Sequence, residues 1–406
     1  MKRLPVAGLI LAAACGSEEP APPVVRDSLG ITIVENIEPA WGGSSQWQLS
    51  GAPIVEIGGA AGGDPNYQFS GVIGSVRLDD GTIVVANDGT KELRWYDASG
   101  SWRHTAGGAA AGPAEFVRIE WLGRFGPASV IAYDRGNLRF SIFDGDGTLL
   151  QSTGLVVTFQ TPPGSVQGVF GDSTLLVVRG VRYWADALMR SGDSPEGLVR
   201  GPSTVSRYTS TGEYINGLGT FAGSEQIFQT GRTRIVRLRA RPFGRDAVFA
   251  AAGDRLYVGT QDDFEIRVRH YTDSLTTIIR AERGKVPVSQ ADVDRYVSAR
   301  MAGVHEVQRA DREAELRALP YPDTMPAFAD ILVDTEGNLW VADFRPFGTE
   351  LPFWTVFDAT HRMLGTVATP SGLTVLQVGS DFVLGVARDD SGTETVQVYA
   401  LNKQAG

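Results

Sequence analysis

An internal repeat is the feature that most constrains how this chain can fold. A strand, a turn that contains Gly, a second strand, a polar break and a third strand that ends in an aromatic residue recur along the sequence. The aromatic residues near the ends of the third strands are Tyr96, Phe143, Tyr208, Tyr271, Phe357 and Tyr399. Two neighbouring pairs are separated by 47 residues (96 to 143) and 42 residues (357 to 399). The basic repeat is therefore roughly 45 residues long.

A repeat of this length is typical of a four-stranded propeller blade. Because there are six aromatic markers, we predict an all-β fold, a six-bladed β-propeller in which the larger separations hold insertions. The composition agrees with this prediction, since 49 glycines and 21 prolines favour many tight turns between short strands. A hydrophobic content of 42% is enough for the chain to bury a core.

The last repeat supplies only three strands, near 373–378, 382–387 and 395–401. We expect the N-terminal segment 52–57, which precedes the first repeat, to add the fourth strand to the last blade and so close the ring. Such closure removes the exposed edges that an open sheet would carry. The earlier segment 30–34 is expected either to pair further out on this blade or only to lead into it.

Two Gly-rich phrases connect this repeat to a known group of propellers. The phrase Gly-Pro-Ala-Glu-Phe at 112–116 resembles the one that opens a blade in NHL-repeat proteins, and 63–69 is a looser version of it. Over approximately residues 50–401 the chain is similar to the six-bladed β-propellers of the NHL-repeat group. The resemblance implies the fold but little chemistry, because such propellers include binding proteins, scaffolds, lyases and lactonases.

The N-terminus has the pattern of an export signal. Lys2 and Arg3 precede an apolar run at 4–14 that is too short to span a bilayer as a helix. The sequence Leu-Ala-Ala-Ala-Cys at 11–15 resembles the lipobox of bacterial lipoproteins, with Ala where that family more often has Leu or Val in the second place. The resemblance implies a lipoprotein signal peptide at 1–14 and a lipid on Cys15.

The residues that follow predict a tether and then the folded domain. The small, acidic and Pro-rich composition at 16–23 cannot pack, so we expect a flexible tether at 15–29 and the propeller at 30–406. The chain is therefore predicted to belong to the cell envelope, held by its lipid in the periplasm or at the outer membrane. Gly16 after the cysteine is similar to the pattern of proteobacterial lipoproteins sent to the outer membrane.

Loop lengths single out one face of the predicted propeller. The turns on one face are tight, whereas the insertions fall on the other face, which we call the long-loop face. These insertions are at 180–202, 220–245, 283–326 and 345–351. Long loops that converge on one end of a rigid scaffold usually carry the binding function. We therefore expect a binding site on the long-loop face, over blades three to five.

The largest insertion is predicted to be helical at about 286–319, between blades four and five. Ser289 can cap a helix, and apolar residues follow it at helical spacing. The apolar stripe contains Val293, Tyr296, Val297, Met301 and Val304. We expect this stripe to pack on the rim of the propeller, and the alternative is a lid or a helix that docks a partner.

A row of cations stands out in a chain whose formal net charge is −10. Arg237, Arg239 and Arg241 alternate along an extended segment, so their side chains share one side of it. Together with Arg345, which is expected on the same face, they are candidates to bind a carboxylate, sulfate or phosphate. The alternative is a solvated strand face, or a row that is paired with nearby acids.

Acidic residues at the ends of second strands provide a different candidate site. Asp134, Asp262 and Asp343 are expected near the mouth of the central channel. A ring of oxygens there could hold Ca²⁺, as in the gluconolactonase-like propellers, and would make the protein a calcium-dependent hydrolase or lactonase. The alternative is that these residues end their strands by bonding their own backbone, in which case no cofactor is expected.

The sequence disfavours several other functions. The acidic net charge disfavours sequence-independent nucleic-acid binding, a single cysteine cannot form an intrachain disulfide, and there is no Gly-x-Ser-x-Gly nucleophile motif. The main hypothesis is therefore a monomeric binding or scaffold module rather than an enzyme, with a protein, glycan or small anionic ligand on the long-loop face. The alternatives are the calcium-dependent hydrolase and a docking module in a larger envelope complex.

Overall fold

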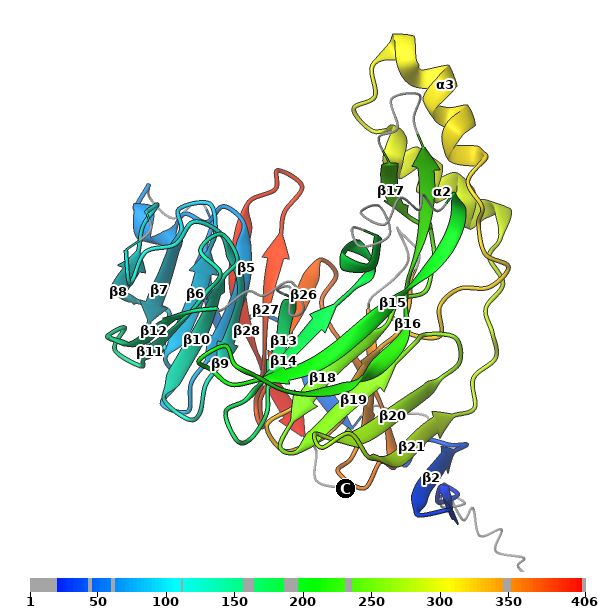
Figure 1. Cartoon of the computed structure of the whole chain (residues 1–406), viewed down its shortest axis with the longest axis horizontal. Coiled ribbons are helices and arrows are strands. Elements are labelled where there is room, and N and C mark those ends of the chain that lie inside the picture. The colour runs from blue at the N-terminus through cyan, green and yellow to red at the C-terminus, as the bar shows by residue number, and fades with distance from the viewer. Residues whose placement is uncertain are drawn as a thin grey trace, which may run out of the picture.

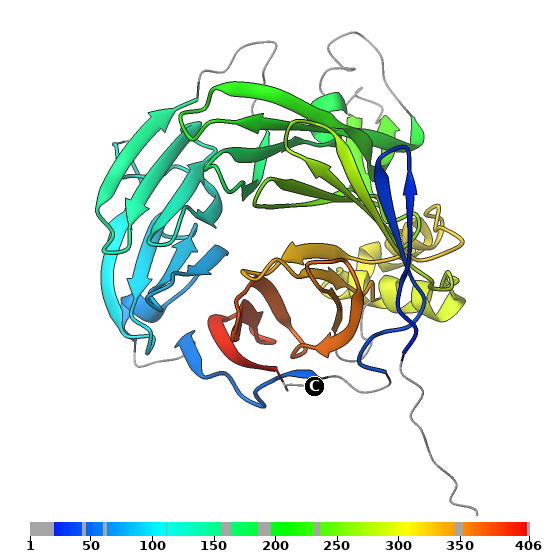
Figure 2. The ribbon, with the colours of Figure 1, turned by 90° about the horizontal axis from the view of Figure 1, so that it is seen from below.

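The computed structural model describes residues 20–42, 46–59, 63–110, 112–155, 164–185, 196–230, 236–345 and 352–403. Six sheets stand around a central axis (Figures 1 and 2). The first strand of each sheet lies beside the first strand of the next, and the sixth lies beside the first, so the ring is closed. The predicted all-β, six-bladed propeller is therefore confirmed.

Each of the first three blades is formed by one stretch of chain. Blade one contains β5 (Val72–Arg77), β6 (Ile83–Asn87), β7 (Glu92–Tyr96) and β8 (Trp102–Gly107). Blade two contains β9 (Ile119–Arg124), β10 (Ser129–Asp134), β11 (Arg139–Asp144) and β12 (Leu149–Gly154). Blade three contains β13 (Ser165–Val169), β14 (Leu175–Arg179), the long strands β15 (Gly197–Tyr208) and β16 (Tyr214–Thr230), and β17 (Val236–Ala240).

The other three blades complete the ring. Blade four contains β18 (Val248–Ala252), β19 (Arg255–Gly259), β20 (Glu265–His270) and β21 (Leu275–Ala281). Blade five contains β22 (Asp330–Val333), β23 (Leu339–Ala342), β24 (Phe353–Phe357) and β25 (Met363–Ala368). Blade six contains β26 (Leu373–Val378), β27 (Phe382–Arg388) and β28 (Glu394–Lys403), and β4 (Val55–Gly58) pairs with β28. The prediction that 52–57 closes the last blade is confirmed.

Three of the six aromatic markers, Tyr96, Phe143 and Phe357, are followed by an Asp that has a local structural role. Asp97 follows β7, and its Oδ1 accepts the backbone N–H groups of Ser99 and Ser101 at 2.9 and 3.0 Å. The carboxylates of Asp144 and Asp358 accept N–H groups two and four residues ahead in the same way. These aspartates satisfy donors that the tight turn leaves unpaired, so the turn to the fourth strand forms at this point.

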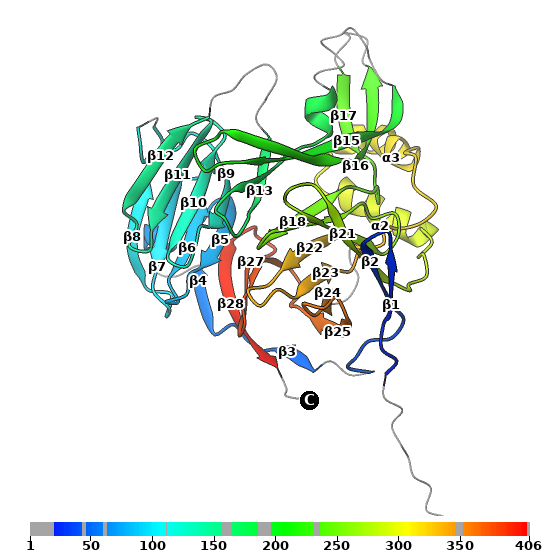
Figure 3. The same ribbon diagram turned by 60° about the horizontal axis from the view of Figure 1, so that its bottom comes forward.

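The residues before blade one form a belt around the outside of three blades (Figure 3). β1 (Val24–Ser28) and β2 (Ile31–Asn36) form a hairpin, and β2 adds to β21 of blade four in a parallel register. The N–H groups of residues 40 and 41 then donate to backbone carbonyls of blade five at 2.9 and 2.8 Å. β3 (Trp47–Leu49) pairs with the end of β28 in blade six. We call residues 31–42 and 46–58 the belt.

Two expectations for this region need correction. Segment 30–34 neither pairs on blade six nor only leads into it, because the outer edge of β21 in blade four takes β2 and buries Ile33 and Val34 there. The predicted tether at 15–29 is too long, because Val24–Ser28 pairs with β2 as strand β1. All five residues of β1 are nevertheless exposed, so this strand is held by its backbone pairing rather than by burial.

Asn36, the last residue of β2, links blades four and five. The residue is 2% exposed. Its Nδ2 donates to the backbone carbonyls of Arg280 (3.1 Å) and His361 (3.2 Å), and its Oδ1 accepts the N–H of Met363 at 2.7 Å. One buried amide therefore fixes the belt to the outer strands of both blades.

His361 is buried at the same junction. It lies in the turn between β24 and β25, is 7% exposed, and its ring centroid is 6.3 Å from that of Tyr257. Burial, together with the nearby positive charge of Arg255, lowers the pKa of His361 to about 4, although Asp358 opposes the shift. His361 is therefore neutral in the folded protein at pH 7.

The helical insertion packs on the extended strands of blade three. It contains α2 (Gln290–Met301), capped by Ser289, and a second helix, α3 (Glu306–Arg317). The apolar side chains of the insertion share a small core with β16 and the residues after β17. The buried members of this core are Ile227, Phe243, Tyr296, Val297, Met301, Leu316, Leu319 and Met325. The insertion and β16–β17 thus form an arch that stands above the ring (Figure 1).

No helix in the described ranges has the length and apolar character needed to cross a membrane.

Replacing the buried amide of the belt should destabilise the whole propeller. In Asn36→Ala, the N–H of Met363 and two carbonyls lose their partner inside the protein, which should lower the free energy of unfolding by about 1–3 kcal/mol. Urea unfolding of the full chain measures this change. Leu29→Ser is the matched control, because Leu29 is 100% exposed and should change stability by no more than about 0.5 kcal/mol. Equal midpoints for the two variants would contradict the linking role of Asn36.

His361 should make stability depend on pH below neutrality. Between the unfolded pKa of 6.5 and the folded pKa of about 4, the unfolded chain binds more protons than the folded chain. Stability should therefore fall as the pH drops through this window, by up to about 3 kcal/mol. His361→Asn, which suits the left-handed φ of +69° at this residue, should remove this component. The free energy of unfolding of the native protein and of His361→Asn, measured between pH 7 and pH 4, tests this prediction. If both proteins lose the same stability over this range, His361 is not the cause.

Candidate ligand-binding site

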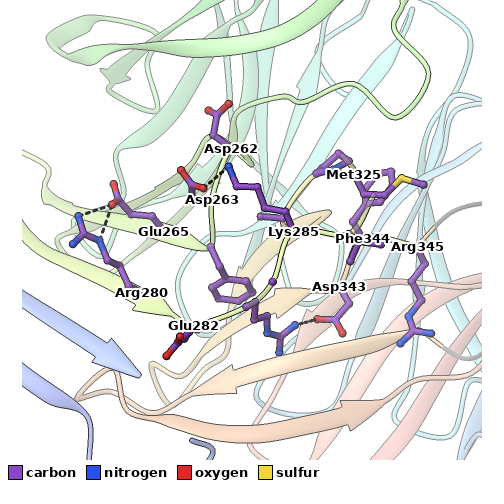
Figure 4. Close-up of a pocket in the computed structure, with 17 residues that line it drawn as sticks. Asp262, Asp263, Glu265, Arg280, Glu282, Lys285, Met325, Asp343, Phe344 and Arg345 are labelled. Atoms are coloured by element: carbon purple, nitrogen blue, oxygen red, sulfur yellow. Dashed lines mark hydrogen bonds and ion pairs between the residues drawn. The ribbon is translucent and has the colours of Figure 1, made fainter. Parts of the chain in front are cut away.

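A cleft of about 690 Å³ opens on the long-loop face between blades four and five. Its walls come from the loop after β19, the chain that leaves β21, the chain that enters β22 and the loop after β23, at the foot of the arch (Figure 4). The charged lining residues are Asp262, Asp263, Glu265, Arg280, Glu282, Arg283, Lys285, Asp343 and Arg345. The walls belong to two consecutive blades, whose first strands, β18 and β22, lie side by side.

Most of these charges are compensated in pairs. The pairs are Arg280 with Glu265 (2.9 Å), Lys285 with Asp263 (2.9 Å), Arg283 with Asp343 (2.8 Å) and Arg200 of blade three with Asp262 (2.6 Å). Each pair connects two separate segments of the chain, so the pairs hold the walls of the cleft in position. Compensation also leaves little net charge along most of the lining.

Arg283 contacts both walls of the cleft. Its Nη1 donates to Asp343 Oδ1 at 2.8 Å, and its Nη2 donates to Thr355 Oγ1 at 2.5 Å. The guanidinium lies over the ring of Phe264, 4.8 Å from its centroid. Phe264 belongs to blade four and Asp343 to blade five, so Arg283 ties both blades to the linker between them.

Arg345 differs from the other cations of the cleft. Within the described ranges it has no carboxylate partner, and its guanidinium lies over the ring of Phe353 at 4.8 Å. Its Nε is enclosed and has no hydrogen-bond acceptor among the described residues. With no carboxylate beside it in the described ranges, the guanidinium charge is unbalanced, and an anionic group in the cleft would balance it. Arg345 is therefore the lining residue best suited to take an external anion.

The other three arginines predicted to bind an anion lie on β17. Arg239 pairs with Glu315 of α3 at 3.1 Å, and Arg241 pairs with Glu225 of β16 at 3.2 Å. These two residues do not line the cleft, and their contacts correspond to the alternative of a row paired with acids. Arg237 pairs with Gln229 through the strand register, and its side chain lies outside the described part.

The three predicted metal ligands are not brought together. Asp134 lies in blade two, is 0% exposed and accepts three backbone N–H groups at 2.9–3.0 Å, so it ends its strand by bonding the backbone. Asp262 and Asp343 both line the cleft, but each has an arginine partner. No group of three His, Cys, Asp or Glu side chains in the described ranges could hold a metal ion.

The pKa of Asp262 reflects its arginine partner. Burial alone would raise the pKa of this carboxyl. Hydrogen bonds from Arg200 and Thr260, with the positive charges of Arg200 and Arg245, outweigh burial and place the pKa below its ordinary value. Asp262 is therefore an anion whose charge is already balanced by the protein, which makes it a weak candidate for a metal ligand.

Several lining residues carried no signal in the sequence. Arg283 and Lys285 follow β21, and their partners Asp343 and Asp263 lie in other loops, so only the folded chain shows the pairs. The insertion at 283–326 had been expected on this face, and the cleft uses its two ends. Cys15, the signal peptide at 1–14 and 346–351 lie outside the described residues.

Comparisons with known proteins find only distant structural similarity. No family model and no curated protein matches it. Similar solved structures include a protein provisionally described as exported from Bacteroides fragilis, with 12% identity, coverage of 92% of this chain and 100% of that chain, and a TM-score of 0.47. A DUF4221-family member from Bacteroides vulgatus has 8% identity, coverage of 88% and 99%, and a TM-score of 0.46. A gluconolactonase from Xanthomonas campestris has 14% identity, coverage of 82% and 87%, and a TM-score of 0.42.

Two ion pairs of the cleft should differ in their contribution to stability. Arg283→Ala leaves the partly buried Asp343 without its cation and should lower the free energy of unfolding by about 1.5–3 kcal/mol. Lys285→Ala is the matched control, because Lys285 and Asp263 are 59% and 68% exposed, and it should change stability by no more than about 1 kcal/mol. Urea unfolding measures both, and a larger loss in the lysine variant would contradict the role given to Arg283.

Calcium should not stabilise the protein. The three acidic candidates are separated or paired with arginine, so we expect equal melting temperatures in excess EDTA and in excess Ca²⁺. A site that bound Ca²⁺ only in the folded state would add about 2.7 kcal/mol at 100-fold above its Kd. A higher melting temperature in Ca²⁺ that is lost in Asp262→Asn would contradict this expectation and support the hypothesis of a calcium-dependent hydrolase.

Proposed function

We propose that this chain is a lipid-anchored binding module of the cell envelope that captures an anionic ligand in the cleft between blades four and five. The observation that carries the proposal is Arg345, the one cation lining the cleft that has no carboxylate partner in the described ranges. Three other cations of the lining are held by Glu265, Asp343 and Asp263. A single uncompensated guanidinium in a preformed cleft favours a ligand with one anionic group.

The cleft has the dimensions and rigidity of a binding site. Its volume of about 690 Å³ lies within the range of roughly 300–1,000 Å³ typical of small-ligand sites. The ion pairs and the stacking of Arg283 on Phe264 hold its walls before a ligand arrives. Preorganisation of this kind reduces the entropy lost on binding.

The N-terminal hairpin of β1 and β2 supports a position close to the membrane. β1 begins nine positions after Cys15 (24 − 15), on the rim of blade four. A second hollow, of about 350 Å³, is lined by Val24 and shares 280–282 with the lining of the cleft. A lipid on Cys15 would therefore hold the cleft near the membrane surface.

Removing Arg345 should weaken anion binding without unfolding the protein. A bidentate guanidinium–carboxylate contact contributes about 1.5–3 kcal/mol, so Arg345→Ala should weaken binding of any ligand carboxylate by about ten- to a hundredfold. Arg345→Lys should retain part of the affinity, because it keeps the charge but not the planar fork. Calorimetric titration of the full chain with a panel of small carboxylates and sulfates measures this effect.

Arg118→Ala is the control for that titration, because it removes an exposed positive charge from blade two, outside the cleft. Affinities that fall equally in the Arg118 and Arg345 variants would indicate only a general charge effect. Affinities that do not change in Arg345→Ala would contradict the proposed site.

A further inference from the structure

We infer that the ligand of the cleft is a saccharide that carries one carboxylate, of the uronic-acid type. This inference rests on the proposed function and names the class of ligand for the same site. It depends on three features of the lining: compensated ion pairs with free acceptors, one uncompensated cation, and an uncompensated acid on the other side of the cleft.

The compensated pairs are suited to hydroxyl groups. In the pair with Arg283, Asp343 uses Oδ1, and in the pair with Lys285, Asp263 uses Oδ1. The Oδ2 atoms of both carboxylates have no protein partner in the described ranges. A carboxylate whose charge is already balanced can accept a hydrogen bond from a neutral hydroxyl without attracting a mobile cation. Two such acceptors in one cleft favour a ligand with more than one hydroxyl group.

The uncompensated charges limit the ligand to one anionic group. Arg345 and Glu282 lie on opposite sides of the group drawn in Figure 4. Glu282 is exposed and has no cationic partner in the described ranges, so it repels a second anion at its side of the cleft. Arg345, at the other side, attracts one carboxylate. A sugar acid joined to a neutral sugar satisfies both conditions.

The strand edges argue against an extended peptide. β21, which leads into the cleft, is paired with β20 on one side and with β2 of the belt on the other. It therefore offers no free edge to which a peptide could add as a further strand. The polar groups that remain available are side chains, and side-chain donors and acceptors suit a saccharide.

The test is calorimetric titration of the full chain, in detergent, with four probes. The first is a disaccharide of glucuronic acid and glucose, and the second is the neutral disaccharide that has glucose in place of glucuronic acid. The third is digalacturonic acid, which has two carboxylates, and the fourth is triglycine, a peptide with a free carboxylate. Each probe is titrated into the native chain, Arg345→Ala, Glu282→Gln and the control Arg118→Ala.

The inference predicts that the first probe binds at least about tenfold more tightly than the other three, and that Arg345→Ala removes this preference. Glu282→Gln should improve binding of digalacturonic acid several-fold and leave that of the first probe nearly unchanged, because only the second carboxylate meets Glu282. Arg118→Ala should bind all four probes like the native chain.

Two other outcomes separate the inference from the proposed function. If triglycine binds as tightly as the glucuronic acid disaccharide, and both depend on Arg345, the anion site stands but the saccharide inference is overturned. If no probe distinguishes the native chain from Arg345→Ala, the inference and the proposed function both fail.

Discussion

The pairing of β4 with β28 is the contact on which the rest of the structure depends. It completes blade six with a strand from the other end of the chain and places Ile57 in one core with Val72 of blade one and Phe382 of blade six. Every blade buries its two faces against its neighbours, so an open ring would expose apolar surface at the break. Because β4 is the last strand of the belt, closure also draws the belt across the rims of blades four, five and six.

The cleft follows from that arrangement. Asn36 joins the belt to blades four and five, and Arg283 joins the linker to the same two blades on the long-loop face. The two blades are therefore fixed on both sides of the cleft, and the loops that line it have rigid supports. Arg345 remains as a charge that the protein itself does not balance within the described ranges. Most charged groups of the lining thus contact one another, and the proposed ligand contact falls to Arg345.

The sequence predicted the parts of the fold that have local causes. Three of the six aromatic markers are followed by an Asp that closes the next turn, as Asp97 does, and the recurring aromatic residues allowed the blades to be counted. The closing strand was predictable because the last repeat lacked one strand. The place of β2 was not predictable, since a short apolar strand fits any free sheet edge and the register with β21 joins residues more than two hundred positions apart.

The sequence predicted only part of the cleft, because contacts between distant segments decide which charges are balanced. Alternation showed that the arginines of β17 share one side, but not that α3, which supplies Glu315, lies against that side. Arg345, Asp262 and Asp343 were all singled out, and all three line the cleft. Their roles could not be assigned from the sequence, because whether a charge is balanced depends on partners such as Arg200 and Arg283 from distant segments.

A crystal structure of the full chain with the glucuronic acid disaccharide tests the central claim most directly. We predict that the sugar lies in the cleft between blades four and five, with its carboxylate in hydrogen-bond contact with the guanidinium of Arg345. The ring hydroxyls should contact Asp343 or Asp263, whose Oδ2 atoms face no protein partner among the described residues. A sugar bound in the central channel, or on the turns of the opposite face, would contradict the assignment of the cleft as the binding site.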